Sequence, residues 1–313
     1  MHLGAGASFS MRAYITIVGA DMIGRAKLMH TMGNRCYSYC EYCSARGIWN
    51  GSIYCPFTPP ADAPDEAKNR PGSEYPWATL NPTQLPLRKD NLFRATARHI
   101  AKDMCDSCQK KHGIRGPTIL QQLRSLDFPR SFPPDLMHLM YENVVPALFR
   151  HFRGVFFSSN VKRRSTVSGK NDWTVVGNAF EDSAGFYPFA FGDPLRNFTR
   201  HCHELKAAEW AIVTKQAAPI FLKTLLPEED YNGFLYLVDA ITLLEKPSLT
   251  RTEQKQIGSL LNSFSHYYEA RFYCKQWDRL RVCLPTFHQL LHMKDAIVDL
   301  GPAYVFWQWP MER

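Results

Sequence analysis

Hydrophobic positions recur every three to four residues over most of the second half of the chain, which predicts long amphipathic helices there. The clearest run covers 135–152, where apolar residues form a broad face and the prolines Pro133 and Pro134 suit a helix start. Helical periodicity also extends over 91–111, and over 197–269 almost without interruption. The chain is therefore expected to be α+β and mostly helical.

The first part of the chain has a different pattern. Residues 13–18 (AYITIV) are β-branched and aromatic, which predicts a short strand with Asp21 just past its end. A helix is expected over 24–32. The stretch 36–60 is rich in Cys, Gly, Tyr and Pro, which predicts an irregular loop held by a ligand, and the prolines and mixed charges of 57–87 predict an exposed linker.

The composition is that of a folded protein. Hydrophobic residues make up 45% of the 313 residues and charged residues 21%, which excludes a disordered tail. No run approaches the roughly 20 apolar residues of a membrane span, and the first residues lack the pattern of a secretory signal. We therefore expect no membrane span and an intracellular location.

Charge and cysteine content narrow the candidate partners. Lys and Arg number 37 against 29 Asp and Glu, a net charge of +8 that favours polyanions weakly. The nine cysteines include two CxxC pairs. This usage fits metal-binding thiolates in a reducing compartment better than a disulfide framework.

The first CxxC pair has the spacing of a zinc ligand pair. Cys40 and Cys43 can present both sulfurs to one ion, and far downstream His288 and His292 lie at i, i+4 on one helical face. Together they would form a tetrahedral Cys2His2 set, although histidines on an amphipathic helix are more often partly buried polar residues. Two other cysteines of the same region are competing ligands, Cys36 and Cys55.

The second CxxC pair is less informative. Cys105 and Cys108 have only His99 and His112 nearby, so two unpaired thiols on a helix are the favoured interpretation. Their role stays open.

Two acids have the surroundings of a nuclease site. Asp21 follows the predicted strand, and Glu312 lies where a helix is expected to begin after Pro310. Carboxylates at such places assemble two-metal sites for in-line attack on a phosphodiester. Nothing in the spacing alone pairs the two acids, and an acid at a strand end is more often a solvated side chain or a helix N-cap.

A third group lies on one expected helix face. Asp135, His138 and Glu142 stand at i, i+3 and i+7. Capping of the helix by Asp135, with the other two pairing with neighbours, is favoured over metal binding.

Basic residues cluster in two places and could contact phosphates, although each alone is more simply a solvated charge. They are Lys162, Arg163, Arg164, Arg94, Arg98, Lys110 and Lys111.

The order of these motifs resembles the transposases of CACTA-type (En/Spm-like) mobile elements, of the DDE superfamily. The resemblance rests on the strand followed by Asp21, on GNRCYSYCEYC, LRSLDFPRSFPPDLMHLMYENVVPALF and FHQLLH, and on the ending GPAYVFWQWPMER. It covers nearly the whole chain. Its most specific parts are the DxMHxxxEN block over 135–143 and the WxxPMER ending.

The resemblance implies a ribonuclease H-like core whose DDE triad is split by a long helical insertion. Matched motif by motif, Asp21 corresponds to the second acid and Glu312 to the third, both as Mg²⁺ ligands in DNA cleavage and strand transfer. The V(D)J recombinase catalytic subunit shares this layout more distantly. There an Asp stands nineteen residues before the first Cys of a CxxC, as Asp21 stands before Cys40.

In that distant relative a CxxC and a downstream His pair hold one structural zinc. The resemblance therefore implies one Zn²⁺ bound by Cys40, Cys43, His288 and His292. The implied role of this zinc is to pin the insertion to the core so that the third acid arrives beside the second.

The resemblance also implies a domain organisation. Residues 1–35 would be a partial ribonuclease H-like core, 36–300 a zinc-held helical insertion, and 301–313 the start of the final catalytic helix. The first catalytic Asp is expected upstream of the chain and the rest of the final helix downstream of it. We therefore expect a transposase fragment that is inactive alone.

The partners and location follow from the same resemblance. It implies DNA as the partner and a nuclear location, and it leaves a homo-oligomer open. The alternative is a non-catalytic DNA- or protein-binding module derived from a transposase.

Overall fold

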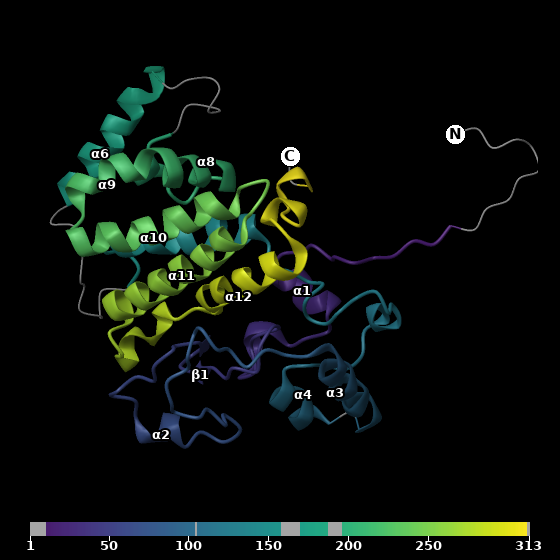
Figure 1. Ribbon diagram of the computed structural model, residues 1–313. Helices are drawn as coiled ribbons and strands as arrows, with labels where there is room; N and C mark the ends of the chain where they lie inside the picture. The colour runs from purple at the N-terminus through teal and green to yellow at the C-terminus, as the bar shows by residue number, and fades with distance from the viewer. Residues whose placement is uncertain (1–10, 104, 158–169, 187–195, 312–313) are drawn as a thin grey trace, which may run out of the picture.

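The computed structural model describes residues 11–103, 105–157, 170–186 and 196–311, and most of them are helical (Figure 1). The mostly helical fold class is confirmed. The α-helices of these residues are α1 (Met22–Leu28), α2 (Asp65–Lys68), α3 (Asp90–Asp103), α4 (Asp106–His112), α5 (Val145–Phe152), α6 (Lys170–Asp182), α7 (Phe198–His201), α8 (Ala207–Ile212), α9 (Ala218–Leu225), α10 (Glu228–Leu244), α11 (Arg251–Tyr268) and α12 (Pro285–Leu300).

Shorter elements connect these helices. The 3₁₀ turns are η1 (Gly33–Arg35), η2 (Ile119–Gln122), η4 (Ser183–Phe186), η8 (Trp277–Val282), η9 (Ala303–Val305) and η10 (Trp309–Met311). The π-helical segments are η3 (His138–Val144), η6 (Val213–Ala217) and η7 (Glu269–Tyr273). The strands β1 (Ile48–Trp49) and β2 (Ile53–Tyr54) form an antiparallel pair.

The long helices α10, α11 and α12 lie side by side in the second half of the chain (Figure 1). Helix α11 begins with a capping box, in which the side chains of Thr250 and Glu253 each accept a hydrogen bond from the other's backbone amide. Helix α10 starts after Pro227 with three acidic residues in its first turn, which suits the positive end of the helix dipole. The side chains between these helices form the main hydrophobic core.

Two smaller clusters organise the first half. One packs Phe93 and Ile100 of α3 against Phe128 and Phe132. The other encloses the cysteine-containing loop, with Tyr39, Tyr42 and Ile53 among its buried members. The cysteine loop therefore has its own small core beside the main one.

The strand predicted over 13–18 is wrong. These residues are extended and join the rest of the protein through a few bonds, such as Val18 N–H to Ser131 O at 2.8 Å. A strand needs a partner along its length, and these residues pair with none in the described part of the chain. Beyond β1 and β2, the described residues contain no sheet, and a ribonuclease H-like core is not confirmed.

Most residues of the Pro-rich segment 57–87 are exposed, but the segment also makes specific contacts with the helical half. Tyr75 is buried in the main core, and the Phe57 amide donates to the Glu269 carboxylate at 2.8 Å. The Ala61 amide donates to the Lys275 carbonyl at 2.8 Å. These bonds satisfy backbone groups that a free linker would leave to water.

Among the helices of the described residues, none combines the length and apolar character that crossing a bilayer requires.

Candidate metal centre

An arginine binds the backbone of the loop that carries Cys40 and Cys43. The Nε atom of Arg88 donates to the carbonyls of Cys40 and Cys43 at 3.1 and 3.0 Å. The Tyr42 amide approaches the Cys40 sulfur at 3.4 Å. These bonds fix the turn between the two cysteines, and the amide contact favours a thiolate on Cys40.

The two histidines come from α12, which begins with Pro285 at its first helical position. Their spacing of four residues places both rings on the face of α12 that meets the cysteine loop. His288 and His292 are only 1% and 2% exposed. The Tyr39 ring stands edge-on to His288, and the Tyr42 ring lies against His292.

The four predicted ligands converge on one point. Nε2 of His292 lies 3.4 Å from Sγ of Cys40, Nε2 of His288 lies 3.2 Å from Sγ of Cys43, and the two Nε2 atoms are 3.2 Å apart. All four ligand atoms lie within 4.8 Å of one another.

These separations fit a tetrahedral ion. Zinc with Zn–S bonds of about 2.3 Å and Zn–N bonds of about 2.0 Å would put sulfur and nitrogen about 3.5 Å apart, and two nitrogens about 3.3 Å apart. The observed distances are close to both values. Cys40, Cys43, His288 and His292 therefore form a group that could hold a metal ion such as zinc.

The electrostatics of the group also suit a cation. Burial raises the pKa of the Cys43 thiol well above its ordinary value, and the neighbouring Cys40 adds to this. Burial acts the same way on Cys40, but the hydrogen bond with Cys43 and the nearby His292 and His288 hold the pKa of Cys40 well below the ordinary value. Burial lowers the pKa of His288. Without a metal, a thiolate on Cys40 would rely on a neighbouring imidazolium for its counter-charge, and a divalent cation can take that place.

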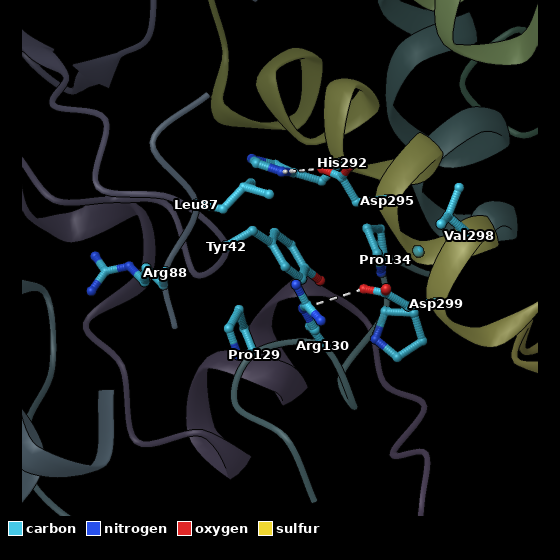
Figure 2. A pocket seen from close by; sticks show the side chains of 12 residues that line it. Tyr42, Leu87, Arg88, Pro129, Arg130, Pro134, His292, Asp295, Val298 and Asp299 are labelled. Atoms are coloured by element: carbon cyan, nitrogen blue, oxygen red, sulfur yellow. Dashed lines mark ion pairs between the residues drawn. The ribbon is translucent and has the colours of Figure 1, made fainter. Parts of the chain in front are cut away.

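A cavity of about 240 Å³ lies behind His292 (Figure 2). Asp295 lines it, with Oδ2 3.8 Å from Nδ1 of His292, and Arg130 pairs with Asp299 at 3.5 Å. The Nδ1 atoms of His292 and His288 have no hydrogen bond among the described residues. A ring that binds metal through Nε2 usually offers Nδ1–H to a carboxylate, and Asp295 stands where it could accept it.

A buried arginine provides a second link between the same two segments. Arg25 is 1% exposed; its Nε pairs with Glu41 at 3.1 Å, and its Nη2 donates to Gln289 Oε1 at 2.9 Å. Its Nη1 donates to the carbonyl of Ala20 at 3.0 Å. Glu41 lies between the two cysteines, and Gln289 follows His288.

The Arg25 network was not predicted from the sequence. Burial raises the pKa of Glu41, while Arg25 beside it acts in the opposite direction. The Arg25 partners Glu41 and Gln289 lie inside the CxxC and HxxxH motifs, but nothing in the spacing of these residues connects either of them with Arg25. From the sequence alone, Arg25 is most simply interpreted as an exposed surface charge, because arginines are rarely buried.

The DxMH block meets the end of the described chain. One oxygen of Asp135 accepts the Gln308 amide at 2.7 Å, and the other accepts the His138 amide at 2.8 Å and contacts His138 Nδ1 at 2.7 Å. Gly19 lies close to the backbone carbonyl of Phe306. A Cβ atom placed on Gly19 would lie 3.6 Å from that carbonyl oxygen. Asp135 thus binds backbone, and His138 also has Glu142 3.9 Å from its Nε2.

Asp21 is the N-cap of α1. Its Oδ1 accepts the Gly24 amide at 2.6 Å, which matches the capping alternative weighed for an acid at this place. The second oxygen of the carboxylate is not part of that bond. Glu312 lies outside the described residues, so its position relative to Asp21 is not described.

The predicted DNA-binding residues have different surroundings. Arg94 is held by Asp90 at 2.7 Å and by backbone carbonyls, so its guanidinium is engaged within the protein. Arg98 is exposed on α3. Lys110 pairs with Asp106, and Lys111 is exposed. Three further residues lie outside the described part, namely Lys162, Arg163 and Arg164.

The other cysteines of the described residues do not belong to the group of four ligands. Cys36 and Cys55 are buried, but neither belongs to the cluster of possible ligands. Cys105 precedes α4 as its N-cap residue, and Cys108 lies within that helix. Both are partly exposed.

No protein-family model, curated protein or solved structure matches this chain, so the interpretation of the centre rests on the geometry of its own four side chains.

Proposed function

We propose that this chain is part of a cut-and-paste DNA transposase of CACTA type, in which a structural zinc joins the segment that follows Asp21 to the helical half. The observation that carries the proposal is the Cys2His2 group itself. It connects a CxxC loop with an HxxxH helix in the motif order of that family, and its four ligand atoms lie within 4.8 Å.

The contacts around the centre support this role. The backbone next to Asp21 is bound by Arg25, which also binds one residue of each metal-binding motif. The WxxPMER ending is bound through Gln308 to Asp135 of the DxMH block. In the proposed enzyme these contacts would bring Asp21 and the final acid to one site, where bound Mg²⁺ would promote phosphodiester hydrolysis.

Metal analysis tests the zinc assignment. The purified chain is expected to contain about one Zn²⁺, and Cys40→Ala or His292→Ala should release it. The matched controls are Cys36→Ala and Cys55→Ala, which remove buried cysteines of the same region and should retain the metal. A wild-type chain that is fully folded without metal would contradict the assignment.

Iron-mediated cleavage tests the proposed role of Asp21. Fe²⁺ replaces Mg²⁺ at carboxylate sites, and with ascorbate and peroxide it cuts the polypeptide beside the bound ion. We expect cuts near Asp21 in the zinc-loaded protein, suppressed by excess Mg²⁺ and lost in Asp21→Asn with zinc content unchanged. Equal cleavage of wild type and Asp21→Asn would contradict a metal-binding role.

A non-catalytic binding module is the second candidate function. The N-cap bond of Asp21 to Gly24 favours it, because this bond gives the carboxylate a structural role. Such a module would retain zinc and bind DNA or protein, but it would give no iron-directed cuts at Asp21. The same experiment therefore distinguishes the two candidates.

A further inference from the structure

A cleft of about 600 Å³ runs along α1, the helix that begins directly after Asp21. One wall is α1 itself, and the rest comes from the turn around η1 and from Arg115. We call this feature the basic cleft. It is separate from the metal centre, because none of the four ligands lines it.

The charged side chains of the basic cleft all have the same sign. They are Lys27, Arg35 and Arg115; the imidazole of His30 also lines the cleft, and no Asp or Glu does. All four are exposed. Lys27, Arg35 and Arg115 form no ion pair with a carboxylate within the described residues, whereas cations elsewhere, such as Lys110, do. Cations gathered without acids leave a local positive potential that attracts an anion.

The backbone fixes these cations before any ligand binds. The Met32 amide donates to the Gly113 carbonyl at 2.9 Å, and the Arg115 amide donates to the His30 carbonyl at 2.8 Å. Nε of Arg115 donates to the Thr31 carbonyl at 3.3 Å, and Nδ1 of His30 lies 3.1 Å from the Pro117 carbonyl. Within the described residues the terminal nitrogens of Arg115 make no hydrogen bond, so they remain available.

We propose that the basic cleft binds the phosphodiester backbone of duplex DNA. This inference rests on the proposed function and deepens it by naming where the substrate backbone is held, next to Asp21. The cleft contains no Phe, Tyr or Trp on which an unpaired base could stack. It therefore favours sequence-independent contacts to duplex phosphates over binding of a single strand.

Binding of a fluorescent duplex of about 30 base pairs, measured by anisotropy across a NaCl series, tests this inference. The zinc-loaded chain is compared with Lys27→Ala/Arg35→Ala. The matched control is Lys223→Ala/Lys255→Ala, which removes the same charge from exposed positions on α9 and α11. Zinc content and urea unfolding show that all three proteins are folded.

We expect the cleft variant to bind roughly 10- to 100-fold more weakly near 0.1 M salt, with a log–log salt slope about 2 smaller in magnitude. The control variant should stay within about twofold of wild type. A single strand of equal length should compete more weakly than the duplex, and inorganic phosphate should compete only at far higher concentration.

Three results would overturn the inference. One is no duplex binding by the wild-type chain, another is equal loss of binding in the cleft and control variants, and the third is tighter binding of the single strand. If the cleft variant loses binding while the zinc or iron experiment fails, the cleft stands and the proposed transposase role does not. If those experiments succeed and the cleft variant binds normally, only the cleft inference is wrong.

Discussion

Replacing Arg25 by Met should strongly destabilise the protein without touching a metal ligand. Arg25 and Glu41 have side chains that are each 1% exposed, and their closest atoms are 3.1 Å apart. The substitution keeps an unbranched apolar stem but removes the guanidinium. It leaves a buried carboxylate without its counter-charge, and it leaves Gln289 and the carbonyl of Ala20 without their donor.

The size of the effect follows from the burial of this pair. Breaking a buried ion pair by removing one partner costs about 3–5 kcal/mol, because the remaining charge stays desolvated. The two orphaned acceptors add to this, although the terms are not independent. Against a total stability of about 5–15 kcal/mol, Arg25→Met should lower the free energy of unfolding by about 4 kcal/mol.

A double-mutant cycle in urea, with zinc held saturating, isolates the pair. Arg25→Met/Glu41→Leu removes both charges and should be more stable than Arg25→Met alone by a few kcal/mol. The control is Arg130→Met, which breaks a pair whose side chains are 58% and 29% exposed and should cost less than about 1 kcal/mol. A cost below about 1 kcal/mol for Arg25→Met, or strict additivity in the cycle, would refute this reasoning.

Three further outcomes follow from other buried or reactive groups. Burial raises the pKa of Glu269 from 4.5 to about 8, so the native state binds more protons than the unfolded state between these values, and stability falls as the pH rises through them. Glu269→Gln should remove most of this slope, worth up to about 4 kcal/mol, in urea unfolding compared at both ends of that range. The hydrogen bond with Ser107 lowers the pKa of Cys105 to about 7, so its alkylation by iodoacetamide, followed by mass spectrometry, should be half-maximal near that pH, and an ordinary thiol value near 8.5 would contradict it. Asp230 is fully buried and binds Arg271 at 2.7 Å, so Asp230→Ala should cost about 3 kcal/mol in thermal or urea unfolding; a cost near zero would mean that the pair adds nothing.

The centre could be predicted from local spacing, but its assembly could not. The CxxC and HxxxH spacings each identify two ligands, because they follow from one turn of backbone and one turn of helix. The residues Cys43 and His288 are 245 positions apart, and no periodicity indicates that they meet. Residue types suggested that the two pairs could complete one Cys2His2 set, and the family resemblance implied that they bind a single ion.

The helical half was also predictable, and the first residues were not. Helical periodicity arises because one face of a helix is buried, and the pattern is the same whichever element covers that face. A β-branched run such as 13–18 becomes a strand only if another strand lies beside it, and that depends on the rest of the fold. The π-helical turn of the DxMH block was missed because its extra residue per turn leaves no signal in the spacing.

The two links between the cysteine loop and α12 explain how so long an intervening segment can be tolerated. The entropy of closing a loop grows only with the logarithm of its length, by about 0.6 kcal/mol for each doubling. The segment between Cys43 and His288 also has its own hydrophobic core, which holds α10 and α11 against α12. The links at its ends therefore need to supply orientation more than energy. The tetrahedral group of four ligands and the guanidinium of Arg25, with its three hydrogen-bond partners, can both orient the segments that they join. Each constrains the directions of its contacts as well as their lengths. Arg25 also donates a hydrogen bond to the carbonyl of Ala20, directly before Asp21. The same guanidinium therefore helps to orient the backbone before Asp21 relative to the cysteine loop and α12.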